Sequence, residues 1–432
     1  MPEQVHGTGD VFGVSRDVPL NYVSRKTVDD RFLEDLGRDR HIVVYGSSKQ
    51  GKTCLRKKCL NDDEYIIVHC LNRWTMSELN STILKRAGYE ITQSTRKTAT
   101  GKNKIDAKIS AGLFGVKAGV EAEATTENAI EKTTTELELD VEDVNDVIAA
   151  LDAIKFKKFV VLEDFHYLPV EAQKDFAVAL KAFHENSEIC FIIVGVWLEE
   201  NRLTVYNGDL TGRITAVNAD LWEKSELRDV VLAGEALLNV SFDSEFTAQL
   251  VEKCHGSVHI LQEVCFQVCE SSKVYRTCEA RLELGHDVDV DALVKCVVDQ
   301  QKGRYNSFLG SFADGFVDTV LEMYKWILYP VIMSSHDDLE RGLKLAQIRK
   351  ALDDNHPAGR RKSPTGNGLN TGNITQALQY SAALQAKKDI KPIVLDYDQT
   401  NVRLNVVDRG FLVWLRHQDR NALLEMVGLP SE

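Results

Sequence analysis

Short apolar runs alternate with amphipathic stretches along the first half of the chain. The apolar runs are rich in β-branched and aromatic residues and have the length of buried strands, at 42–45, 65–69, 159–162 and 189–196. Stretches with helical spacing of apolar positions lie between them, at 76–88, 143–154 and 172–185. Strands that alternate with helices form a parallel sheet covered on both faces. The pattern therefore predicts an α/β fold over residues 1–225.

The pattern becomes helical after this α/β part. Apolar positions recur at helical spacing in four segments, at 226–238, 244–254, 258–270 and 290–300. Gly256-Ser-Val-His259 opens the third of them. The sequence thus predicts a small helical lid over residues 226–300, and a linker at 301–320.

The C-terminal residues 321–432 have a third pattern. Three helical segments (320–333, 343–352 and 374–386) precede two alternating runs, 393–397 and 402–406, that read as a β-hairpin. Three helices followed by a hairpin is the order of a winged helix, whose third helix can enter a major groove. The third helix carries polar side chains that could meet base edges: Asn373, Gln376, Gln379 and Gln385. It has little positive charge before Lys387, and winged helices also bind proteins, so both partners stay open.

Residues 92–140 form a polar insertion in the α/β part. Thr92–Lys104 is rich in Ser, Thr, Lys and Gly and is expected to be a loop. Residues 105–111 and 116–122 then alternate around Phe114-Gly115, as a hairpin would. A surface insertion is the favoured interpretation, a subunit contact or a hairpin that touches DNA are the main alternatives, and a hairpin that enters a membrane is disfavoured.

The N-terminal segment leads into a capped helix. Residues 1–19 are expected to be an extended lead-in, and Tyr22-Val-Ser-Arg25 a turn. Thr27 is a candidate N-cap for the helix that follows, because acidic residues occupy its first turn.

The strand at 42–45 ends in a phosphate-binding loop. Gly46-x-x-x-x-Gly51-Lys52-Thr53 comes directly after it, and a helical segment begins at Cys54. The glycines let the backbone curl so that consecutive N–H groups and the helix N-terminus point at phosphates. Lys52 is expected to reach the β- and γ-phosphates of ATP, and the Thr53 hydroxyl to bind Mg²⁺. The predicted nucleotide contacts in this stretch are Gly46, Ser47, Ser48, Lys49, Gln50, Gly51, Lys52, Thr53 and Cys54.

Two carboxylates follow the apolar run at 159–162. Glu163 and Asp164 occupy the position where one carboxylate holds the Mg²⁺ water shell and the next activates the attacking water. Further on, the turn Gly208–Gly212 presents Arg213, which could reach a γ-phosphate in the same chain or across a subunit boundary.

Composition and charge narrow the class of protein. The 432 residues carry a net charge of −13, which does not suggest a protein coated in nucleic acid. From Lys325 onward 15 basic and 12 acidic residues give +3, which permits a local DNA-binding surface. Nine cysteines without a CxxC pair, no secretory signal and no apolar run long enough for a bilayer predict a cytoplasmic protein without membrane contact. Cys265 and Cys269 are expected to be core residues of a helix rather than zinc ligands.

With these motifs in order, residues 20–300 resemble the AAA+/STAND branch of ATPases, nearest to the archaeal-ATPase and origin-recognition-like group. That group often has a C-terminal winged helix. Its acidic strand ends in Asp-Glu-Phe-Gln-Tyr-Leu, where this chain has Glu163-Asp-Phe-His-Tyr-Leu168. By position, the resemblance gives Glu163 the magnesium role and Asp164 the role of base, and the shorter Asp164 side chain indicates slow hydrolysis.

The resemblance also assigns residues around the base and the lid. It places the adenine near Tyr22 and Arg25, and it makes Arg213 the arginine of the Gly-Arg turn. His259 stands where the lid's second sensor is expected, and Val196 replaces the usual polar first sensor.

Together these features predict an ATP-dependent molecular switch in which Lys52, Asp164 and Arg213 serve catalysis. The resemblance implies self-association and an effector partner, in prokaryotic defence or signalling. Two alternatives stay open: an ATPase that binds or loads double-stranded DNA, in replication or transposition, and a module that holds ATP or ADP without turnover.

Overall fold

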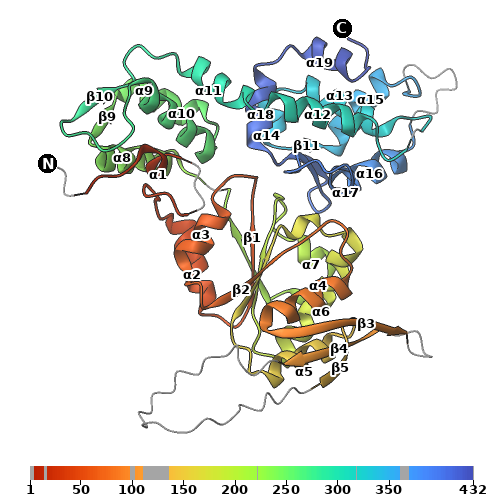
Figure 1. Ribbon diagram of the computed structural model, residues 1–432. Coiled ribbons are helices and arrows are strands. Elements are labelled where there is room, and N and C mark those ends of the chain that lie inside the picture. Colours follow the sequence, from red (N-terminus) through yellow and green to blue (C-terminus); the bar gives the residue numbers. More distant parts are fainter. Residues whose placement is uncertain are drawn as a thin grey trace, which may run out of the picture.

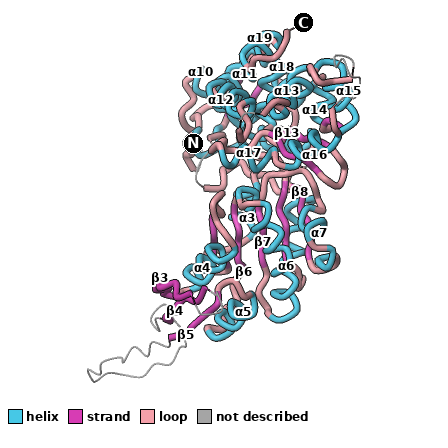
Figure 2. Tube along the Cα trace, turned by 90° about the vertical axis from the view of Figure 1, so that its right-hand side faces the viewer, coloured by secondary structure: helices cyan, strands magenta, loops and turns pink. Residues whose placement is uncertain are grey.

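The computed structural model of the chain describes residues 4–13, 17–97, 103–109, 136–220, 222–317, 319–360 and 369–431. An α/β part forms the lower half of the molecule in Figure 1, and a mainly helical part lies above it. In the perpendicular view of Figure 2 the helical part again lies beyond one end of the strands. In the described part of the chain, no helix is long and apolar enough to cross a membrane.

The central sheet has five parallel strands in the order β2-β6-β7-β1-β8. Their bounds are β1 His41–Tyr45, β2 Tyr65–His69, β6 Phe159–Glu163, β7 Phe191–Val194 and β8 Ile214–Asn218. β1, β6 and β7 are largely buried, and such strands read as continuous apolar runs, which is why the sequence pattern located them. The pattern also located β2, but it did not locate β8, which is partly exposed at the edge of the sheet. The predicted α/β fold with a parallel sheet is confirmed.

Two hydrophobic cores cover the two faces of this sheet. Alternate residues of β1 divide between them, with Val44 in one core and Val43 in the other. The π-helical turn η1 (Lys26–Asp30), α2 (Arg31–Leu36) and α3 (Lys52–Cys59) cover the first face. The second face is covered by α4 Met76–Ala87, α5 Val144–Ala153, α6 Val170–Asn186 and α7 Arg202–Tyr206.

The insertion forms a separate antiparallel sheet, in the order β3-β4-β5. Its strands are β3 Tyr89–Lys97, β4 Asn103–Ile109 and β5 Glu136–Asp140. The prediction of a loop over Thr92–Lys104 is therefore wrong at the two ends of this segment, which belong to β3 and β4. β4 pairs with β3 and β5, and the second arm of the expected hairpin, 116–122, lies outside the described residues.

The lid contains the four predicted helices and two unpredicted short strands. Its elements are α8 Lys224–Leu238, β9 Val240–Phe242, α9 Ser244–Lys253, α10 Val258–Ser271, β10 Leu282–Leu284 and α11 Val290–Asp299. Ser257 caps α10 by accepting from the Ile260 N–H. Cys265 and Cys269 are buried in the core of this helix, as predicted.

Two predictions for the N-terminal segment are wrong. The expected extended lead-in contains a short helix, α1 (Thr8–Val11), because the fully buried Val11 and Phe12 pack into the lid core. A β-carbon at Gly234 of α8 would lie 2.1 Å from the Phe12 ring, so this contact requires glycine there. Thr27 is not an N-cap, since η1 begins at Lys26 without a side-chain cap.

The C-terminal region has the predicted order of helices and hairpin. It contains α13 Met323–Met333, α14 His336–Glu340, β11 Leu343–Lys344, α15 Leu345–Asn355, α16 Thr371–Gln379, α17 Ser381–Lys387, β12 Leu395–Asp398, β13 Arg403–Val406, α18 Arg409–Arg416 and α19 Arg420–Met426. The three strands form an antiparallel sheet in the order β11-β13-β12. The single helix expected at 374–386 is divided at Tyr380 into α16 and α17.

The lid and the C-terminal region share one hydrophobic core. The expected linker contains helix α12 (Lys302–Ala313), whose Tyr305, Phe308 and Phe312 are buried in this core. The two regions therefore form one helical body above the sheet (Figure 1).

Gln385 is a structural residue of the C-terminal region. Its Nε2 donates to the Leu395 carbonyl at 2.7 Å, and its Oε1 accepts from the Val394 N–H at 2.6 Å. The side chain is fully buried. The prediction that Gln385 is available to base edges is therefore wrong.

Candidate nucleotide site

The phosphate-binding loop connects the carboxyl end of β1 to α3, at the end of the sheet that faces the helical body (Figure 1). Gly46 and Gly51 have φ values of +142° and +84°, which side chains rarely adopt. A β-carbon at Gly46 would also lie 2.9 Å from the Asp220 backbone nitrogen. Both glycines of the motif are thus required by the backbone geometry.

Lys52 is folded into the loop. Its buried ammonium donates to the carbonyl of Gly46 at 2.9 Å and to that of Ser47 at 2.5 Å. Burial lowers the pKa of Lys52 to about 8, an effect that the charges of Asp220 and Glu163 oppose. A buried cation among backbone groups is a suitable partner for a phosphate.

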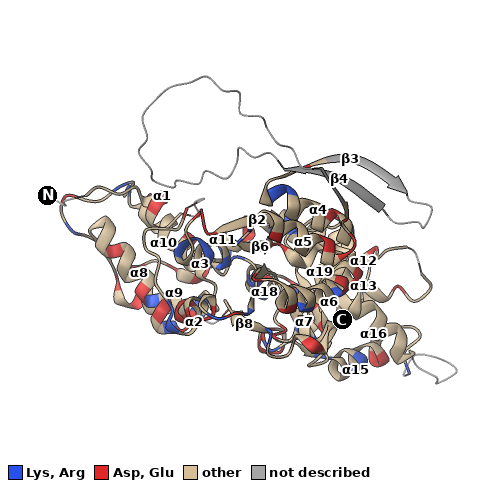
Figure 3. Cartoon of the chain, turned by 90° about the horizontal axis from the view of Figure 1, so that it is seen from below, with Lys and Arg blue, Asp and Glu red and all other residues tan. Residues whose placement is uncertain are grey.

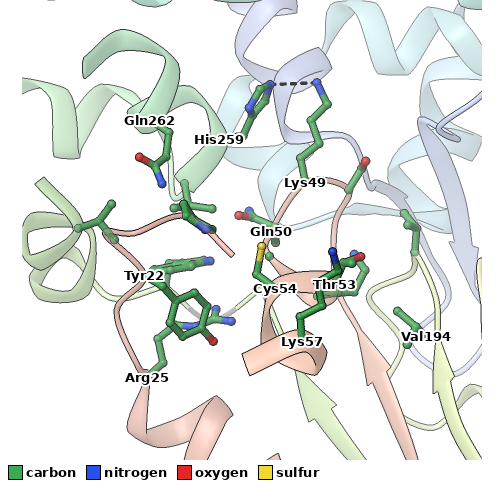
Figure 4. A pocket seen from close by; sticks show the side chains of 18 of the residues that line it. Tyr22, Arg25, Lys49, Gln50, Thr53, Cys54, Lys57, Val194, His259 and Gln262 are labelled. Carbon is green, nitrogen blue, oxygen red and sulfur yellow. Dashed lines mark hydrogen bonds between the residues drawn. The ribbon is translucent and has the colours of Figure 1, made fainter. Parts of the chain in front are cut away.

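The helical body contacts the loop directly. Lys49 Nζ lies 2.9 Å from His259 Nε2 of the lid, a contact drawn in Figure 4. Gln50 Nε2 donates to the Gly256 carbonyl at 3.1 Å, also in the lid. The Ser48 N–H donates to the carbonyl of Val407, just after β13, at 3.0 Å. The loop is therefore held by the lid and by the C-terminal region together.

Asp220, just after β8, joins three parts of the chain. Its carboxylate accepts from the backbone N–H and the hydroxyl of Ser47, each at 3.0 Å. It also accepts from Arg409 of α18 at 3.0 Å, and Arg409 donates to the His255 carbonyl of the lid at 2.9 Å. This junction was not predictable from the sequence, because no local pattern relates residues so far apart in the chain.

The two carboxylates lie at the carboxyl end of β6. Glu163 Oε1 accepts from Arg56 Nε of α3 at 3.1 Å, and both side chains are buried. Burial raises the pKa of the Glu163 carboxyl, an effect that Arg56 opposes. Burial also raises the pKa of Asp164, which has a left-handed backbone with φ of 59°. Arg56 was not identified from the sequence.

Replacing Arg56 with alanine should destabilise the fold by about 3–5 kcal/mol, because it leaves the buried Glu163 carboxylate unpaired. Arg38→Ala is a matched control, since Arg38 is an exposed partner of Asp35 and should cost less than about 1 kcal/mol. Urea unfolding measures both. Equal losses for the two variants would contradict the assigned ion pair.

The residues expected near the adenine lie across the phosphate loop from Val194 (Figure 4). Tyr22 donates its hydroxyl to Asp29 at 2.5 Å. Arg25 is buried, donates to the Ala219 carbonyl at 2.9 Å and lies 4.1 Å from the centre of the Trp222 ring. Trp222 was not identified from the sequence.

The two positions expected to be sensors carry no charged side chain at neutral pH. Val196, just after β7, is buried and presents no polar side-chain group. His259 is in place at the loop, where burial and the charge of Lys49 lower its pKa to about 4. Its imidazole is thus uncharged at neutral pH.

A cavity of roughly 530 Å³ lies between the loop, the acidic strand and the lid. Its size is in the range of small-molecule sites. Of the residues predicted to form the nucleotide site, Gly46, Ser47 and Arg213 do not line it, and all the others do.

Arg213 lies at the end of the sheet opposite the nucleotide cavity of the same chain. Its carbonyl accepts from the N–H of His41, at the start of β1, whereas the loop follows the end of that strand. The separation along the strand is roughly 15 Å. Arg213 instead pairs with Glu185 at 2.7 Å. The prediction that it could serve the site of the same chain is therefore wrong in this conformation.

The strand order, the loop and the carboxylate pair define a P-loop nucleotide-binding fold with an added helical body. No model of a protein family matches the sequence, and no curated protein does. The Walker-type ATPase PABY2304 of Pyrococcus abyssi is similar in structure, with a TM-score of 0.49 and 14% identity, over 94% of this chain and 99% of that one. The Aeropyrum pernix ORC1 protein, solved in complex with DNA, has a TM-score of 0.45 and 11% identity, over 98% and 97%. Cdc6p from Pyrobaculum aerophilum has a TM-score of 0.41 and 11% identity, over 97% of each chain.

Proposed function

We propose that this protein is a slowly hydrolysing ATP switch of the AAA+/STAND type, in which the nucleotide state controls how the helical body docks on the α/β part. The observation that carries the proposal is the hydrogen bond from the Ser48 N–H of the phosphate loop to the Val407 carbonyl. A loop N–H that would otherwise be free to face a phosphate is bonded to the C-terminal region. A phosphate that enters the loop competes with this contact.

Thr53 and Glu163 are the residues that would hold Mg²⁺. Both line the cavity, and a hydroxyl with a carboxylate is an oxygen donor set that suits this ion. When bound, the ion neutralises charge on the β- and γ-phosphates. Lys52 binds the phosphates, and Asp164 accepts a proton from the attacking water.

The C-terminal hairpin also docks on the α/β part. Thr400, in the hairpin turn, donates to Glu199 at 2.5 Å. Asp396 of β12 pairs with Arg202, and both side chains are buried. The hairpin and Gln385, which a winged helix would offer to DNA, are thus engaged inside the molecule. This supports a docked switch in preference to a permanent DNA reader.

The alternative is an ATPase that binds or loads DNA after the C-terminal region is released. Gln376 and Gln379 of α16 remain exposed and could meet a duplex. Acidic and basic residues are interspersed over the described helices in Figure 3, which gives this alternative little electrostatic support. Turnover that rises when duplex DNA is added, and that falls steeply with salt, would favour the alternative.

In either case Arg213 could serve the site of a second copy, and an effector protein could bind the released region.

The Arg409 junction supplies the experiment that tests the switch. Arg409→Ala removes the link between Asp220, α18 and the lid, so we expect ATP turnover to rise about fivefold or more as the loop is freed. Arg403→Ala is the control, because the guanidinium of Arg403, in β13, donates to the carbonyl of Arg341, which lies in the same C-terminal region. Steady-state phosphate release measures both. Unchanged turnover in Arg409→Ala would refute the proposed coupling.

A further inference from the structure

The end of β7 offers no polar side chain to the cavity, which Val194, Gly195 and Val196 line there. β7 lies between β1, which carries the phosphate loop, and β6, which carries the carboxylates. Its carboxyl end therefore points at the space between Lys52 and Asp164. Val196 stands there and offers no hydrogen bond to a phosphate or to an attacking water.

His166 lies at this place although it comes from another strand. It belongs to the short 3₁₀ turn η2 (Phe165–Tyr167), which follows the carboxylates of β6. Its Nδ1 accepts from the backbone N–H of Val196 at 3.3 Å. The imidazole is thus tied to the end of β7, and it lines the same cavity as Lys52 and Asp164.

The contact with Val196 fixes the tautomer of His166. Because Nδ1 accepts a hydrogen bond, the proton of the ring is on Nε2, which is then a donor. Nε2 is buried and has no hydrogen-bond partner among the described residues. The side chain is only 5% exposed, so water does not readily satisfy this donor. A buried donor without a partner is costly, and such a group at the wall of a cavity points to a partner that arrives with a ligand.

We propose that His166 donates its Nε2–H to the γ-phosphate of ATP and so replaces the polar group missing at Val196. The proposal rests on the proposed function, because it requires ATP in this cavity. It makes His166 the residue that distinguishes ATP from ADP, since ADP has no γ-phosphate to accept the bond. The donation requires the side chain to rotate when ATP binds, because Nε2 is buried in the empty cavity wall.

The test compares variants that keep or remove the N–H donor. His166→Leu and His166→Ala remove it, and His166→Gln keeps an amide N–H at nearly the same reach. Calorimetric titration with Mg²⁺ and either ATPγS or ADP gives the two affinities for each variant. We expect both removal variants to weaken ATPγS about tenfold and ADP less than twofold, and His166→Gln to bind ATPγS within about threefold of wild type.

Two results would overturn the assignment. One is equal weakening of ATPγS and ADP in the removal variants, which is what a merely structural role produces. The other is an unchanged ATPγS affinity in His166→Ala. The alanine side chain is smaller than that of histidine, so this variant gives a result even if His166→Leu does not fold. A wild-type chain that binds neither nucleotide would instead overturn the proposed function itself, so the two failures are distinguishable.

Discussion

Replacing Lys52 with alanine should lower the affinity for ATP by about a hundredfold or more and abolish turnover. Lys52 is the buried cation of the loop, and truncating one partner of a buried charge pair costs about 2–5 kcal/mol. Lys58→Ala is the control, because Lys58 is an exposed residue of the same helix and does not line the cavity. Isothermal titration with ATP measures both variants. Equal effects of the two would contradict the assigned role.

The same lysine predicts a pH dependence. With its pKa lowered to about 8 by burial, Lys52 loses its charge in the empty site as the pH rises through that value. The cationic form binds phosphate better, so the affinity for ATP should be full below about pH 8 and decline above it. Repeating the titration across this range checks the sign.

Replacing Asp164 with asparagine should lower kcat about 10²–10⁴-fold and leave ATP binding nearly intact. Asp164 follows β6 at the cavity wall, and we propose that its carboxylate takes a proton from the attacking water. The amide keeps the shape but cannot accept that proton. Asp63→Asn makes the same change at an exposed position between α3 and β2 and should leave turnover unchanged. Single-turnover kinetics separates the chemical step from binding.

A loss of ATP affinity without a loss of rate in Asp164→Asn would contradict this assignment. It would mean that the carboxylate binds rather than reacts, and Glu163 would then be the next candidate for the base. Wild-type protein that binds ATP without any turnover would favour the nucleotide-holding module instead.

The central sheet and the phosphate loop were predictable because their signals are local. A strand buried on both faces must be apolar throughout, and a loop that curls around phosphate favours glycine where φ is positive, as at Gly46 and Gly51. The β3–β5 sheet was missed in part because β4 pairs with both β3 and β5, and no local pattern shows which strands pair. The helix at Thr8–Val11 was missed because its apolar partners belong to the lid, far along the chain.

The site was only partly predictable for a related reason. Spacing identified the loop and the two carboxylates, which are contiguous in the sequence. Arg56, Asp220 and Arg409 act through contacts that no spacing encodes, and each is a charged residue like many others in the chain. Arg213 shows the converse, since a suitable motif lies at the opposite edge of the sheet.

The central claim is that the nucleotide state controls the docking of the helical body, and hydrogen exchange tests it most directly. Exchange of residues 403–416, which contain β13 and α18, should be compared in protein without nucleotide and in protein saturated with Mg²⁺ and ATPγS. We predict that exchange in this segment and at the Ser48 amide differs about fivefold or more between the two states, because a phosphate in the loop competes with the contact to Val407. Identical exchange in both nucleotide states would contradict the switch.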